Sequence, residues 1–93
     1  MRSILKTEKG TCYICHRSGF THEHHIFHGT ANRKKAEEWG MKVDVCPDCH
    51  NKIHTDPEWD SLLKEHGEHM WMIHYKKGIE EFIAVFGKSY LTD

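Results

Sequence analysis

Apolar and polar positions divide the chain into a first part with strand-like patterns and a second part with helical spacing. Residues 41–45 alternate apolar and polar side chains, which predicts a half-buried strand. Ile26 and Phe27 suit a second strand in the segment before it. From residue 59 to 73, and again from 79 to 86, apolar side chains recur three or four positions apart, as on one face of a helix. The pattern predicts an α+β fold with two short strands and C-terminal helices.

Local signals indicate where helices begin and end in the first part of the chain. Thr30 or Asn32 can cap a short helix that continues through Trp39. Gly40 is well placed as the residue that follows this helix, because glycine readily adopts the left-handed conformation found there. Pro47 suits the first turn of a second helix, since its missing N–H would be unpaired there anyway.

The second part of the chain begins with a strong helix start at Asp56-Pro57-Glu58, which combines a capping carboxylate, a first-turn proline and a first-turn acid. Gly67 could break or bend this helix. Gly78 separates it from the last helix. The helical spacing predicts a set of large core residues, namely Trp59, Leu62, Leu63, Trp71, Phe82 and Phe86.

The length and the net charge of the chain limit which functions it can have. A chain of 93 residues predicts a single domain with a small core, for which a bound metal is a plausible source of stability. Its 13 Lys and Arg against 14 Asp and Glu give a net charge of −1, which argues against binding nucleic acid by bulk electrostatics. The basic run Arg33, Lys34 and Lys35 could still contact phosphates, although a solvated surface is the default for such a run.

Two C-x-x-C pairs are the first chemical signal. Cys12 and Cys15 form one pair, and Cys46 and Cys49 form the other. Two such pairs can complete a tetrahedral site of four thiolates, which favours a structural Zn²⁺ ion. The alternative is two disulfides in a secreted domain. The N-terminus has no apolar core of signal-peptide length and no apolar run approaches membrane-spanning length, so we expect a reduced, cytoplasmic protein without a membrane partner.

Histidines near these cysteines are the second signal. His50 and His54 lie four positions apart on the predicted helix, which is the spacing that two imidazoles need to share an ion. His24 and His25 are neighbours on a predicted strand, so their side chains point to opposite faces. One of them could bind a metal while the other acts on a water molecule. Three histidine ligands would leave coordination positions open for water and substrate.

Together these motifs resemble those of the HNH endonucleases, also called ββα-metal or His-Me finger nucleases. The similarity covers roughly residues 11–55, and it is closest to the short, often phage-encoded members whose core is held by a four-cysteine zinc knuckle. It implies a zinc-stapled ββα-metal core, a two-stranded sheet plus a helix, in residues 11–55, and a C-terminal helical extension in residues 56–93 of one domain, 1–93.

The resemblance also implies roles for individual residues. His25 matches the general base of the family motif. His24 matches the metal ligand just before the base. His50 and His54 match the ligand positions on the helix.

The middle residue of the family motif is less clear. Many members carry an asparagine a few residues before the third cysteine, where this chain has Met41 and Lys42. Asn32 is the only asparagine between His25 and Cys46, so we assign it this role. It could orient the imidazole of His25 through its carbonyl oxygen, or it could simply cap a helix.

The expected activity is metal-dependent hydrolysis of DNA. His25 would take a proton from water, the resulting hydroxide would attack phosphorus in line, and the metal would neutralise charge on the pentacovalent phosphate and the leaving 3′ oxygen. The resemblance implies 5′-phosphate and 3′-hydroxyl ends. Imidazole ligands favour Mn²⁺, Ni²⁺ or Zn²⁺ over Mg²⁺ as the catalytic metal. Expected partners are DNA and either a second copy or a phage packaging or recombination assembly. The competing hypothesis is a catalytically silent zinc module that binds nucleic acid or protein.

Overall fold

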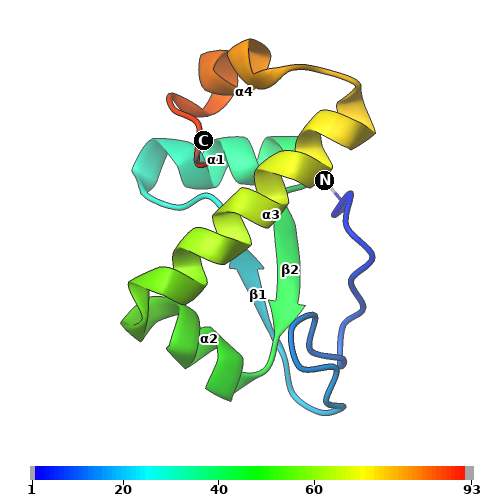
Figure 1. Cartoon of the computed structure of the whole chain (residues 1–93). Coiled ribbons are helices and arrows are strands. Elements are labelled where there is room, and N and C mark those ends of the chain that lie inside the picture. The colour runs from blue at the N-terminus through cyan, green and yellow to red at the C-terminus, as the bar shows by residue number, and fades with distance from the viewer. Residues whose placement is uncertain (1, 92–93) are drawn as a thin grey trace.

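The computed structural model describes residues 2–91 and has the predicted α+β class, with a two-stranded antiparallel sheet and four helices (Figure 1). In chain order the elements are β1 (His22–His25), α1 (Thr30–Trp39), β2 (Lys42–Val45), α2 (Pro47–Thr55), α3 (Pro57–Tyr75) and α4 (Ile79–Phe86).

The sheet sets the positions of the first histidines. His22 pairs with Val45 at one end of the ladder, and His25 pairs with Lys42 at the other. The prediction that Ile26 and Phe27 belong to the strand is wrong, because β1 ends at His25. Both residues follow directly and are fully buried: the amide of Ile26 still donates to the carbonyl of Met41 at 3.0 Å, and the chain then bends to place both side chains in the core.

Helix α1 ends where the sequence predicts but begins differently. Gly29 is the N-cap, with a φ of 96° and no side-chain cap, so neither Thr30 nor Asn32 caps the helix. Thr30 is the first helical residue and Asn32 lies in the first turn. Gly40 ends the helix in the left-handed conformation, and a Cβ there would meet the carbonyl oxygen of Arg2, so glycine is required for two reasons.

Helices α2 and α3 begin at their prolines as predicted. Asp56 is the N-cap of α3, and its carboxylate accepts a hydrogen bond from the amide of Glu58 at 3.0 Å. Gly67 does not break α3, which continues to Tyr75. A Cβ at Gly67 would lie 2.9 Å from Ile26 Cγ2, so glycine allows the helix to approach the segment that follows β1.

The C-terminal helices complete the core. Helix α3 runs across the sheet, and α4 lies beyond α1 at one end of the molecule (Figure 1). Phe27 packs against Phe82 and Phe86 of α4, with ring centroids 5.2 and 4.6 Å apart. Trp71 of α3 joins the same cluster.

Four of the six predicted core residues are buried, namely Leu63, Trp71, Phe82 and Phe86. The prediction is wrong for Leu62, which is 55% exposed. Trp59 is half-buried, with Lys52 Nζ 5.3 Å above its ring.

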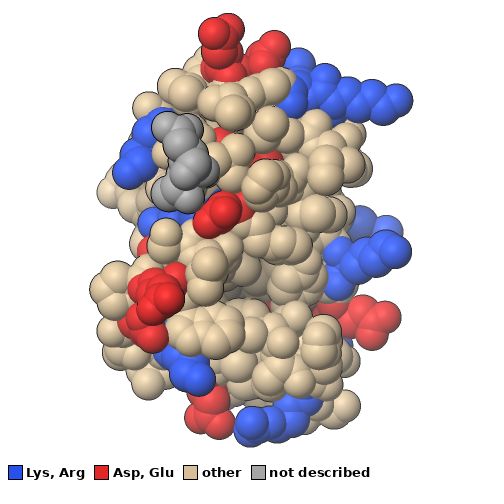
Figure 2. All heavy atoms as spheres, viewed as in Figure 1, with Lys and Arg blue, Asp and Glu red and all other residues tan. Residues whose placement is uncertain are grey.

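The surface mixes both signs of charge. On the face shown in Figure 2, blue Lys and Arg side chains alternate with red Asp and Glu side chains without a dominant patch, as the net charge of −1 leads one to expect. Within residues 2–91, none of the helices combines the length and the apolar character needed to cross a bilayer.

Candidate metal centres and catalytic site

The four cysteines converge on one point. Cys12 and Cys15 lie in a tight turn, and Cys46 and Cys49 lie at the start of α2. Their four sulfurs are all within 4.8 Å of one another, close enough to hold one metal ion, and all four cysteines are free thiols. The predicted four-cysteine cluster is confirmed as a geometry that could bind zinc, and the alternative of two disulfides is not what the structure forms.

Backbone amides support the cluster as they do in metal knuckles. The amide of Cys15 donates to Cys12 Sγ, and the amide of Cys49 donates to Cys46 Sγ, each at 3.4 Å. Burial opposes ionisation of Cys12, but backbone hydrogen bonds outweigh it and lower the pKa of its thiol to about 6. Burial and the neighbouring sulfurs raise the pKa of Cys49. Four neighbouring thiols cannot all ionise, because the thiolates would repel one another. A bound cation would allow four thiolates to coexist here.

Three histidines form a second cluster. His50 and His54 project from the same face of α2, with their Nε2 atoms 3.0 Å apart. His24 faces them from β1, with ring centroids 5.5 and 5.6 Å from theirs. One nitrogen of each ring lies within 4.8 Å of the others, so the three can hold one metal ion.

The surroundings of His24 are those expected of a metal-binding histidine. Its side chain is buried, and its Nε2 has no hydrogen-bond partner among the described residues. A buried polar atom without a partner is costly, and a metal ion would satisfy it. Burial, followed by repulsion from His50 and His54, lowers the pKa of His24 to about 4. The imidazole is therefore neutral near pH 7, as metal coordination requires.

His25 lies beside this cluster. Its side chain projects from the other face of β1 than that of His24. Both histidines nevertheless line one cavity of about 270 Å³. The residues around this cavity are Glu23, His24, His25, His28, Arg33, His50 and His54. The arrangement brings His25, His28, the three clustered imidazoles and the guanidinium of Arg33 around one space.

The partner of His25 is Glu37 of α1, not Asn32. His25 Nε2 lies 3.1 Å from Glu37 Oε1, whereas no hydrogen bond joins Asn32 to His25 among the described residues. Asn32 is half-buried in α1 and does not line the histidine cavity. Its role as the orienting residue stays a prediction without support from this geometry.

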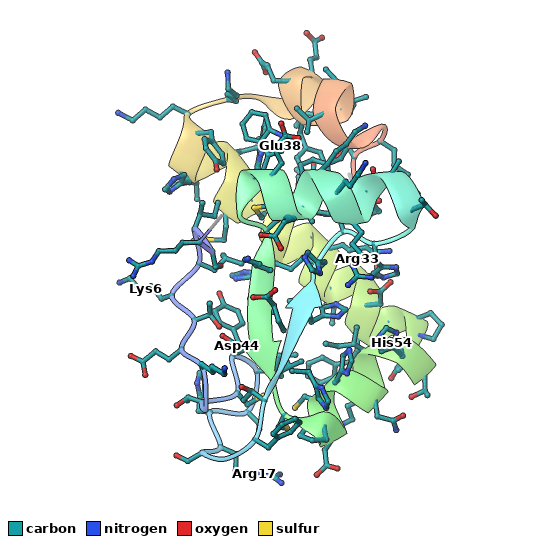
Figure 3. All side chains as sticks on the ribbon, turned by 180° about the vertical axis from the view of Figure 1, so that it is seen from behind. Lys6, Arg17, Arg33, Glu38, Asp44 and His54 are labelled. Atoms are coloured by element: carbon teal, nitrogen blue, oxygen red, sulfur yellow. The ribbon has the colours of Figure 1, made fainter. Side chains whose placement is uncertain are left out.

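The basic run spreads around α1 as expected for three consecutive helical residues. Arg33 lines the histidine cavity, and Arg33 and Lys34 line a second cavity with His25. Lys35 lines neither. Figure 3 shows Arg33 and His54 at the same edge of the molecule.

The sequence did not single out Glu37 or Asp60, whose carboxylates contact histidines at this site. The Nε2 of His28 lies 3.1 Å from Asp60 Oδ1, and Asp60 also pairs with Lys64 at 2.9 Å. The sequence offered no signal for either carboxylate, because both come from helices whose approach to the histidines depends on tertiary packing. Asp60 therefore reaches the histidine cavity through its contact with His28, which lines it.

No protein-family model, curated protein or solved structure matches this chain.

Proposed function

We propose that the chain is a metal-dependent endonuclease of the HNH type that hydrolyses DNA phosphodiester bonds. The observation that supports this best is the shared cavity, in which His25 stands beside the His24, His50 and His54 cluster. A base next to a three-imidazole metal site is the combination that metal-assisted hydrolysis needs.

His25 is the proposed general base. Its side chain is only 12% exposed, so its orientation is restricted, but it lines an open cavity that water can enter. An imidazole has an intrinsic pKa near neutrality and can accept a proton from water at about pH 7. The hydroxide formed attacks phosphorus, and the O–P bond to the 3′ oxygen breaks.

Arg33 is the proposed phosphate contact. It borders both cavities that His25 lines, and its guanidinium can donate two parallel hydrogen bonds to phosphate oxygens. Lys34 borders one of them and adds charge. These contacts would place the scissile phosphate against His25.

A divalent ion on His24, His50 and His54 would supply charge neutralisation at the phosphate and the leaving oxygen. The cysteine cluster has four protein ligands and no open position, so its proposed zinc is structural.

The deciding experiment is cleavage of supercoiled plasmid with added Mg²⁺, Mn²⁺, Ni²⁺ or Zn²⁺, comparing the native protein with His25→Ala. We expect metal-dependent nicking, stronger with Mn²⁺ or Ni²⁺ than with Mg²⁺, and its loss in the variant. His69→Ala is the matched control, because His69 is exposed on α3 and borders neither cavity. Equal nicking by the His25 variant would exclude His25 as the base.

The competing function is a silent zinc module that binds nucleic acid or protein. The balanced charge of the chain favours it, since a nuclease usually needs a basic surface to hold its substrate. Full zinc loading of the cysteines with no cleavage in any metal would favour this second function.

A further inference from the structure

The side of His25 that faces α1 carries a charged cluster that the proposed reaction does not yet use. Glu37 Oε1 lies 3.1 Å from His25 Nε2, and Glu37 Oε2 lies 2.6 Å from Lys42 Nζ. Three elements supply these groups: β1, α1 and β2. His25 and Lys42 are direct partners in the strand register, so the sheet holds them side by side under the helix.

The charges in this cluster determine the direction of its hydrogen bonds. The hydrogen bond from Lys42, reinforced by the one from His25, lowers the pKa of Glu37 to about 2. Glu37 is also the main cause of a raised pKa at Lys42. Glu37 is thus an ionised carboxylate that can only accept, so His25 must donate through Nε2–H. The lone pair of a neutral His25 is then on Nδ1.

A metal ion is the other occupant that this cluster could suggest, because Glu23, His25 and Glu37 lie close enough to share one. Lys42 Nζ is already 2.6 Å from Glu37 and 3.5 Å from Glu23. Its ammonium group supplies the positive charge that a cation would bring. A protein cation in this position argues for an organising role, and leaves His25 free of metal.

We propose that Glu37, braced by Lys42, is the positioning residue of His25: it accepts the Nε2–H hydrogen bond and so directs Nδ1 toward the water that is to be activated. This inference rests on the proposed nuclease function. Carboxylate partners of a functional imidazole fix its tautomer and ring orientation. Their loss typically reduces activity about 10- to 100-fold at metal-bound imidazoles, and by more in a tightly coupled triad.

The test compares Glu37→Ala with Glu38→Ala in the zinc-loaded protein. Glu38 is the matched control, because it is the next residue on α1, carries the same charge and is exposed, on the side of the helix away from the strands (Figure 3). In plasmid cleavage, we expect Glu37→Ala to lower kcat about 10- to 100-fold with little change in KM. Glu38→Ala should leave both values near native. Far-UV circular dichroism and zinc content show whether each variant keeps its fold.

A second readout does not need activity. Proton NMR of the native protein should show a slowly exchanging Nε2–H signal of His25, assigned by its loss in His25→Ala. The signal should disappear in Glu37→Ala and persist in Glu38→Ala. A merely structural role of Glu37 would not couple the loss of this signal to a loss in kcat.

The outcomes separate the two proposals. If His25→Ala is inactive while Glu37→Ala cleaves like Glu38→Ala, the positioning role is wrong and the nuclease function stands. If the native protein lacks the Nε2–H signal, the contact itself is wrong. If the native protein cleaves nothing in any metal, the nuclease function is overturned, and the positioning role falls with it even where the NMR signal is present.

Discussion

At the scale of single residues, His24 is a side chain whose ionisation depends strongly on its surroundings. Burial and neighbouring imidazoles lower its pKa to about 4 in the folded chain, against an ordinary value of 6.5. As the pH falls below about 6.5, His24 therefore binds a proton in the unfolded state but not in the folded state. Stability linked to His24 is complete at neutral pH and is lost progressively as the pH falls toward 4.

This linkage predicts a measurable slope. Between about pH 7 and about pH 5.5, the His24 contribution should reduce the free energy of unfolding by about 1 kcal/mol. Urea titrations at several pH values, with metal supplied only in the amount the cysteines require, should show a steeper pH dependence for the native chain than for His24→Gln. Identical slopes would mean that His24 is protonated normally in the folded protein.

The residues that could be predicted from the sequence are those whose spacing is itself the signal. The C-x-x-C spacing and the four-residue interval between His50 and His54 each place two ligands side by side. The grouping of these residues at candidate metal sites was therefore predictable. Glu37 could not be predicted, because its contact with His25 depends on how α1 crosses the strands. The prediction for Asn32 rests on its being the only asparagine between His25 and Cys46, and residue type alone does not place a side chain.

At the scale of elements, α3 and the segment after β1 depend on one glycine. The sequence left open that Gly67 breaks or bends the helix, because glycine favours helix less than alanine by about 1 kcal/mol. The structure shows instead that the missing side chain allows close packing, with Ile26 and Phe27 against the helix backbone. Propensity describes an isolated helix, whereas this position is decided by what lies across from it.

We therefore predict that Gly67→Ala is destabilising. Overpacking costs about 1–3 kcal/mol, and the better helix propensity of alanine offsets about 1 kcal/mol of that. The net loss in free energy of unfolding should be about 1 kcal/mol, measured by urea denaturation. Ser61→Ala at an exposed position of α3 is the control and should be neutral or slightly stabilising. A more stable Gly67→Ala would show that Ile26 can move away at no cost.

At the scale of the whole molecule, the balanced charge makes any DNA affinity depend on a few local cations. Replacing Arg33, Lys34 and Lys35 with alanine should weaken DNA binding and flatten its dependence on salt, because each lost phosphate contact lowers the slope by about one. Fluorescence anisotropy with a short DNA duplex at increasing salt concentrations measures the affinity and its salt dependence. Lys77→Ala, which lies beyond α3 and borders neither cavity, should leave the slope unchanged. If the triple variant keeps the salt dependence of the native protein, Arg33, Lys34 and Lys35 do not contact DNA.

The two candidate metal centres should differ in what they contribute to the whole molecule. The four cysteines join the N-terminal turn to the start of α2, so binding there also contributes folding free energy. The histidine cluster joins β1 to α2, which already pack together through the sheet and core. Loss of the first metal should therefore strongly destabilise the fold, whereas loss of the second should leave the fold intact.

Metal analysis of the purified protein and its variants tests this difference. The native chain should hold about two zinc ions when zinc is saturating. His54→Ala should hold about one and keep its circular dichroism spectrum, because only the open site has lost a ligand. Cys49→Ser should lose zinc from the cysteines and unfold at a clearly lower temperature. A native chain that holds only about one zinc ion, with no loss in His54→Ala, would show that the three histidines bind no zinc, and the nuclease proposal would lose its second ion.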